Sequence, residues 1–201
     1  MNLIGKFHSH ITVLDGSRAS DILDINNIRH KATTIKLSGD GAEQIDVMIT
    51  QHFHTRRWGS YSNIKAEILR TKKILTDSGV AVIRVKIEHE DLPTIPPSEF
   101  NYRECHIKMR IPNSIYCGLI SKLSQDTKLN KFRLSNNPNE VKDEYTHHFL
   151  NARVYSGTII EFDSNVQEAA NHLRGLGVNV IEAKIESTIY DSRLSHDRWW
   201  A

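Results

Sequence analysis

Two pairs of histidines near the start of the chain have a spacing that suits chemistry. His8 and His10 flank a serine in "KFHSHITV", and His52 and His54 flank a phenylalanine in "QHFH". Alternate residues of a β-strand point to the same face, so each pair would present two imidazoles together. Such a pair can chelate a transition metal or exchange protons with a substrate. Which of these applies depends on the elements that carry the pairs.

The elements repeat along the chain. "GVAVIRVKIE" (79–88) and "GVNVIEAKIE" (177–186) are identical at seven of ten positions. Apolar residues recur at helical spacing just before each copy, at Ile64, Ile68 and Leu75 and at Val166, Ala169, Ala170 and Leu173. Gly79 and Gly177 stand where these helices should end in a left-handed turn. We therefore predict a tandem duplication.

Each copy shows the order strand, helix, strand, strand, helix, strand. Segments 17–30 and 114–125 are the predicted first helices. Ser62 or Asn63 would cap the second helix of the first copy, and Asp163 or Ser164 its counterpart. This order is that of the split βαβ, ferredoxin-like unit. We predict an α+β protein with two such sheets, helices on their outer faces, and a cleft where their open faces meet.

The domain prediction follows from the repeat. Residues 1–92 form the first ferredoxin-like repeat, the proline-containing segment 93–100 is a linker, and residues 101–188 form the second repeat. Residues 189–201 are a C-terminal tail, which Trp199 and Trp200 would pack against the domain.

Alternation along the strands separates an apolar face from a polar one. Phe7, Ile11 and Val13 share one face of the opening strand, and Cys105, Ile107, Met109 and Ile111 share it in the second copy. The opposite faces collect His, Lys, Arg, Glu and Asn. We expect the apolar faces to receive helices and Cys105 to be a core thiol.

Histidines occupy matching polar-face positions, His10 and His106, in the two opening strands. Two imidazoles facing each other across a cleft can divide acid and base catalysis, so both are candidate catalytic residues. Other polar-face side chains could hold an anionic ligand. These candidate binding residues are His8, Thr12, Glu104, Lys108, Arg110, Asn151, Arg153 and Tyr155. Arg153 has a simpler interpretation as the partner of a neighbouring carboxylate such as Glu104 or Glu182.

The word His10-Ile11-Thr12-Val13 resembles the H-x-T-x motif of the 2H phosphoesterases. That resemblance implies two ferredoxin-like lobes around a cleft and metal-independent hydrolysis of cyclic phosphates or RNA ends, with His10 as acid or base and Thr12 as a phosphate ligand. The second copy departs from the motif, because His106-Ile107-Lys108 has a lysine in place of the hydroxyl residue. The leading interpretation is a protein that binds a phosphorylated or anionic ligand between its lobes, a phosphoesterase-type hydrolase if it is an enzyme.

Two alternatives stay open. One is a non-catalytic binding or interaction module whose charged faces pair with each other or with a partner protein. The other is a histidine-ligated metalloenzyme. Against the metal, we expect the first and third strands to run parallel, which would set His8 and His10 far from His52 and His54. We therefore predict no metal ligands, and no cofactor either, since neither a P-loop nor a Rossmann glycine pattern is present.

Composition limits the partners and the cellular location that we expect for the protein. A net charge of +2 is too mild for a surface that coats nucleic acid. The basic and aromatic run "HTRRWGSY" (54–61) is a local exception that could be a loop in contact with nucleic acid or a solvated turn. Two cysteines without a CxxC pair indicate neither a zinc knuckle nor a disulfide scaffold. We expect a cytoplasmic protein whose partner is a small anionic ligand, a nucleotide or an RNA end, with no membrane contact. The oligomeric state is not predicted.

Overall fold

A computed structural model describes residues 3–39, 42–90, 101–141 and 144–196. The first half contains β1 (Lys6–Val13), α1 (Gly16–Ile25), β2 (Lys31–Gly39), β3 (Ala42–His54), α2 (Thr55–Trp58), α3 (Tyr61–Asp77) and β4 (Val82–His89). The second half contains β5 (Tyr102–Pro112), η2 (Asn113–Ile115), α4 (Tyr116–Gln125), η3 (Thr127–Leu129), β6 (Arg133–Val141), β7 (Tyr145–Val154), α5 (Ile159–Gly175) and β8 (Asn179–Asp191). No helix in these ranges is both long and apolar enough to span a membrane.

The strands do not form the two predicted sheets. They are hydrogen-bonded in the order β1-β3-β2-β6-β7-β5-β8-β4 as a closed barrel. The prediction of two ferredoxin-like sheets with helices on their outer faces is therefore wrong. The physical reason lies at the edges: a ferredoxin-like sheet leaves two edge strands with unpaired backbone groups. Here β2 pairs antiparallel with β6, and β4 pairs antiparallel with β8, so those edges are closed.

The chain divides into two compact units that differ from the two sequence repeats. The first unit comprises residues 1–34, 46–103 and 186–198, and the second comprises residues 35–45, 104–185 and 199–201. The dividing lines fall inside β2, β3, β5 and β8, so each of these strands contributes to both units. The predicted linker 93–100 and the tail residues Trp199 and Trp200 lie outside the described residues. The residue boundaries of the repeats stay a prediction.

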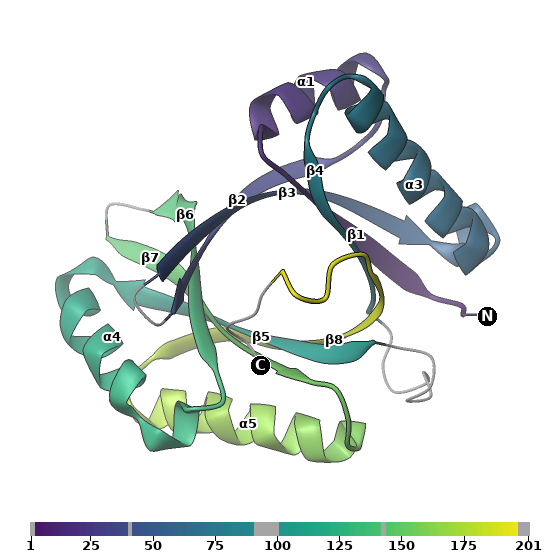
Figure 1. Ribbon diagram of the computed structural model, residues 1–201. Helices are drawn as coiled ribbons and strands as arrows, with labels where there is room; N and C mark the ends of the chain where they lie inside the picture. Colours follow the sequence, from purple (N-terminus) through teal and green to yellow (C-terminus); the bar gives the residue numbers. More distant parts are fainter. Residues whose placement is uncertain (1–2, 40–41, 91–100, 142–143, 197–201) are drawn as a thin grey trace. The chain divides into compact units, whose positions relative to one another are not determined.

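In the first unit, α1 and α3 pack on the apolar side of β1, β3 and β4 (Figure 1). The core contains Phe7, Ile11, Val13, Ala19, Leu23, Ile49, Ile64, Ile68, Leu75, Val85 and Ile87. Helix α3 buries Ile64, Ile68 and Leu75, as its helical spacing predicts. It begins two or three residues earlier than expected, because the Ser60 side chain accepts a hydrogen bond from the Asn63 N–H at 3.2 Å. Gly79 ends it with φ of +80°.

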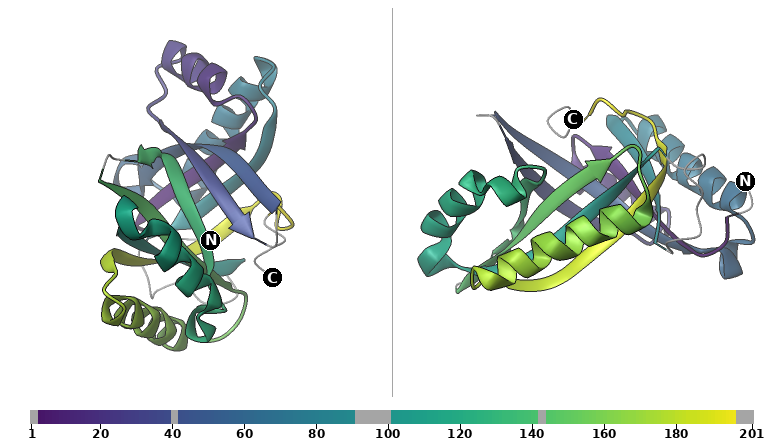
Figure 2. Two further views of the ribbon diagram at one scale, coloured as in Figure 1. Left: turned by 90° about the vertical axis from the view of Figure 1, so that its left-hand side faces the viewer. Right: turned by 90° about the horizontal axis from the view of Figure 1, so that it is seen from below.

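The second unit has its own core, in which α4 and α5 pack against β5, β7 and β8 (Figure 2). Cys105 is one of its buried members, as expected, and burial raises the pKa of its thiol to about 12. Helix α5 starts before the predicted cap residues Asp163 and Ser164. Its N-terminus is a capping box in which Thr158 and Glu161 bond each other's backbone N–H groups.

A pair of neighbouring residues on α3 tests this core. Ile68 is fully buried, whereas Leu69 is 38% exposed. Because a truncated core side chain leaves a cavity, Ile68→Ala should lower the free energy of unfolding by about 2–5 kcal/mol. The control Leu69→Ala should cost less than about 1 kcal/mol. Equal losses for the two variants in urea denaturation would contradict this placement of the helix.

Candidate functional site

The polar face of β1 is buried like its apolar face. His8 and Thr12 are each less than 5% exposed, although they alternate with the core residues Phe7 and Ile11. The predicted polar face therefore exists, but it is not a solvated one. Buried polar groups must find partners, so the neighbours of these side chains define what the face can do.

The partners come from the strands on either side. β1 lies between β3 and β4 and is antiparallel to both. His8 lies opposite His52 on β3 and opposite Glu88 on β4. His10 lies opposite Thr50 on β3 and opposite Lys86 on β4. The expectation that the first and third strands run parallel is wrong, and the two histidine pairs are neighbours along the register rather than far apart.

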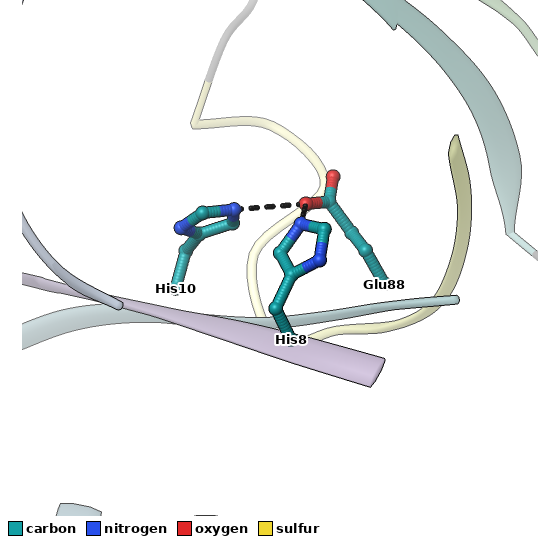
Figure 3. Close-up of side chains that lie close together, drawn as sticks. All are labelled: His8, His10 and Glu88. Atoms are coloured by element: carbon teal, nitrogen blue, oxygen red, sulfur yellow. Dashed lines mark hydrogen bonds and ion pairs between the residues drawn. The ribbon is translucent and has the colours of Figure 1, made fainter. Parts of the chain in front are cut away.

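Two imidazoles and one carboxylate meet at the centre of this face. Nε2 of His8 lies 2.6 Å and Nε2 of His10 lies 2.9 Å from the same oxygen, Oε2 of Glu88 (Figure 3). One ligand-type atom of each residue lies within 4.8 Å of the others. Glu88 has no exposed surface. We call His8, His10 and Glu88 the His-His-Glu centre.

The remaining polar atoms of the His-His-Glu centre contact side chains that are not part of the centre. Nδ1 of His8 donates to Oε1 of Glu90 at 3.1 Å, and Nδ1 of His10 lies 3.0 Å from the Thr50 hydroxyl. The Lys86 ammonium lies 2.6 Å from Oε1 of Glu88. All three side chains are thus fixed with their inner atoms turned toward one another. A further carboxylate oxygen, Oε1 of Glu186, lies 3.5 Å from Nε2 of His8.

The two imidazoles differ in charge. Burial would lower the pKa of His8, but hydrogen bonds to Glu186, Glu88 and Glu90 outweigh it and raise that pKa well above its usual value. Burial lowers the pKa of His10 to about 4 despite Glu88. For Glu88, burial acts to raise the pKa, but Lys86 and His10 hold it well below its usual value. These shifts favour an anionic Glu88, a neutral His10 and a protonated His8.

A second group that could hold a metal shares His8. It consists of His8, His52 and Glu90, with Nδ1 of His52 3.8 Å from Oε1 of Glu90. The His52 side chain is 70% exposed. His54 does not join this group, because its Nδ1 accepts the backbone N–H of Arg56 at the start of α2. The His-His-Glu centre is the more buried and more constrained of the two.

The predicted site residues of the second repeat have their own partners. His106 bonds Asn151 at 2.7 Å, and Asn151 also donates to Ser135 and to the Arg133 carbonyl. Arg153 pairs with Glu104 at 3.4 Å, which confirms the simpler interpretation of that arginine.

Three further candidates lie on aromatic rings or at the surface. The Lys108 ammonium lies 5.6 Å from the Phe149 ring centroid, and the Arg110 guanidinium lies 4.4 Å from that of Tyr145. Tyr155 is 52% exposed. These contacts do not gather the three side chains around one anion-binding point.

Thr12 lies next to a separate ion pair rather than at the centre. Its β4 neighbour Arg84 forms a bidentate ion pair with Asp191, with Nε 3.0 Å from Oδ1 and Nη2 2.5 Å from Oδ2. The Tyr102 hydroxyl donates to the same carboxylate at 2.8 Å. Burial would raise the pKa of Asp191, but Arg84 and Tyr102 lower it below its usual value.

Sequence reasoning found both histidines of the centre but not the residues that complete it. Lys86 and Glu88 lie on the predicted polar face, in the repeated segment "KIE". No feature of the sequence marked them as partners of His8 and His10. Glu90 lies just beyond that word. An antiparallel pairing of the first and fourth strands would have placed Glu88 beside His8.

Comparison with known proteins does not assign the chain to a family. No family model and no curated protein matches the chain. A mutant chlorite dismutase from Candidatus Nitrospira defluvii is 10% identical, with 92% of each chain covered and a TM-score of 0.29. A heme-binding protein from Thermus thermophilus is 10% identical, with 94% of this chain and 92% of that chain covered and a TM-score of 0.29. An anthrone oxidase-like protein is 11% identical, with 95% and 94% covered and a TM-score of 0.28. Likeness at this level assigns neither family nor function.

The phosphoesterase interpretation is corrected. It required two facing ferredoxin-like lobes, and the strand order gives a closed ring instead. Without two such lobes, the expectations of a ferredoxin-like protein and of a phosphoesterase-type hydrolase are not supported.

The Arg84–Asp191 pair gives a pH-dependent expectation. A carboxyl group whose pKa is lowered by folding stabilises the protein above its unfolded value of 3.8, and this stability is lost as the pH falls through the folded pKa. Asp191→Asn should therefore cost about 3 kcal/mol at neutral pH, because it leaves Arg84 buried without its anion. The difference between wild type and variant should shrink below pH 3.8 in urea denaturation. A difference that stays constant with pH would contradict the pair.

Proposed function

We propose that this protein binds one divalent first-row transition-metal ion through Nε2 of His8, Nε2 of His10 and a carboxylate oxygen of Glu88. The observation that carries the proposal is the convergence of both Nε2 atoms on a single oxygen of a fully buried glutamate. Two imidazoles and one carboxylate are donors that zinc, iron and related ions accept.

The outer contacts support a metal site over a simple hydrogen-bond cluster. Histidine ligands of metals commonly donate their other ring N–H to a carboxylate or another polar group, which fixes the ring. His8 does so to Glu90, and the Thr50 hydroxyl lies within hydrogen-bond distance of Nδ1 of His10. Lys86 binds the oxygen of Glu88 that faces away from the histidines. Every ligand is therefore oriented by a second residue.

Charge and distance also favour a cation. Glu88, Glu90 and Glu186 place three carboxylates around His8, and the Lys86 ammonium pairs with Glu88. Donors bound about 2.1 Å from one ion lie about 3.0–3.4 Å apart in octahedral or tetrahedral geometry, so the atoms of the His-His-Glu centre need to separate by less than about 1 Å. An ion would take the place of the proton shared between His8 and Glu88, because histidine and glutamate bind a metal in their deprotonated forms.

Three protein ligands leave coordination positions open. In zinc and iron enzymes such positions accept a water molecule or a substrate oxygen, which the ion polarises. Glu186 is placed to bind an open position directly or through water. The histidine-ligated metalloprotein is thus the function that the geometry supports best.

Metal content is the direct test. The full chain, stripped with a chelator, should take up about one Zn²⁺ or Fe²⁺ per chain in titration calorimetry and elemental analysis. His10→Ala and Glu88→Gln should weaken binding by about 100-fold or more, because each removes a ligand. His172→Ala is the matched control, since His172 pairs with Asp126 in the second unit. Substoichiometric uptake by the wild type, or equal loss in the control, would reject the site.

A milder substitution tests the outer contacts. Glu90→Gln should weaken metal binding by about 10–100-fold while the stoichiometry stays at one, because His8 loses the carboxylate that orients its ring. Glu168→Gln, at an exposed position on α5, should leave the affinity unchanged. Circular dichroism of each variant checks that the fold is intact. An affinity unaltered by Glu90→Gln would show that the outer carboxylate does not support a ligand.

A further inference from the structure

A pocket of about 640 Å³ lies in the first unit beside the His-His-Glu centre. Its walls come from the α1–β2 connection, from β3 at residues 50–53, from α2 and from α3. Two of its residues touch the centre: Thr50 bonds His10, and the His52 ring lies 5.8 Å from that of His8. Its size lies within the range of about 300–1,000 Å³ that is typical of small-molecule sites. We call it the basic pocket.

Cations dominate its lining. Arg29, Lys31 and Arg57 are exposed in the pocket, and no ion pair with any of them occurs among residues 3–39, 42–90, 101–141 and 144–196. Arg70 also lines it, but Glu67 binds both Nε and Nη2 of that guanidinium at 2.9 and 2.6 Å. Three positive charges without a carboxylate of their own favour a ligand with a doubly charged anionic group, such as a phosphate ester.

The pocket also offers an aromatic ring and a buried polar atom. Trp58 is half-buried and packs edge-on against Phe53, with ring centroids 5.4 Å apart. Gln51 is only 5% exposed, yet its side-chain Oε1 accepts no hydrogen bond within the described part of the chain. An unsatisfied buried amide costs free energy, which a ligand with an N–H or O–H group would recover. Planar rings that carry such donors stack well on tryptophan.

The segment that carries Arg57 and Trp58 is fixed before any ligand arrives. Thr55 is buried, and its hydroxyl accepts the Gly5 N–H at 3.0 Å. Gly59 ends α2 with φ of +81°, a conformation that other residues rarely adopt. Asn63 donates to the Trp58 carbonyl at 2.8 Å. A site ordered in advance loses less conformational entropy when it binds.

We infer that the basic pocket binds a nucleoside monophosphate. Arg29, Lys31 and Arg57 bind its phosphate, Trp58 packs against its base, and Gln51 accepts a hydrogen bond from it. The inference rests on the lining of the pocket and not on the metal.

Titration calorimetry of the full, chelator-treated chain with AMP, ribose 5-phosphate and adenosine tests the inference. AMP should bind about tenfold or more tightly than either of the others, because only AMP engages both the cations and the tryptophan. Its affinity should fall as salt is added. Arg57→Gln and Trp58→Leu should each weaken AMP binding about tenfold.

The neighbouring arginine is the matched control. Arg56 is exposed and does not line the pocket, so Arg56→Gln should leave AMP binding unchanged. Equal effects of Arg56→Gln and Arg57→Gln would overturn the inference, as would equal affinities for AMP and adenosine. Tighter binding of a short RNA than of AMP, unaltered by Arg57→Gln, would also overturn it. AMP binding should persist in Glu88→Gln, which separates this result from the fate of the metal site.

Discussion

A carboxylate with no exposed surface is the constraint around which the polar side of the first unit is arranged. Burying the charge of Glu88 is costly unless partners surround it, and each partner comes from a defined place. Lys86 stands two residues away on the same strand, and His8 and His10 come from the adjacent strand. Removing one partner would leave a buried charge, so the whole group is held in one arrangement.

This constraint explains why β1 can be buried on both faces. Its apolar side packs under α1 and α3, where Phe7 and Ile11 contribute ordinary hydrophobic contacts. Its other side carries histidines whose polar atoms are matched across the strands on either side. A ligand site built on strands in this way has little freedom to relax. Its donor atoms stay close to the positions that an ion requires.

Local features were predictable from the sequence, and the long-range pairing was not. The helical spacing of Ile64, Ile68 and Leu75, the left-handed glycine Gly79 and the core position of Cys105 all depend on nearby residues or on burial. The pairing of β2 with β6 and of β4 with β8 depends on which edges meet, and strand periodicity carries no information about that. The His-His-Glu centre was missed for the same reason. The sequence indicated His8 and His10, but their contact with Glu88 requires the antiparallel register of two strands about eighty residues apart.

The sharing of β2, β3, β5 and β8 between the two units has a consequence for how the molecule comes apart. A duplicated sequence usually suggests modules that can be separated, yet here each module would lose strand segments to the other. If one unit unfolds, the shared strands lose part of their backbone hydrogen bonding, which destabilises the other unit as well. The protein should therefore melt in one cooperative transition rather than in two steps.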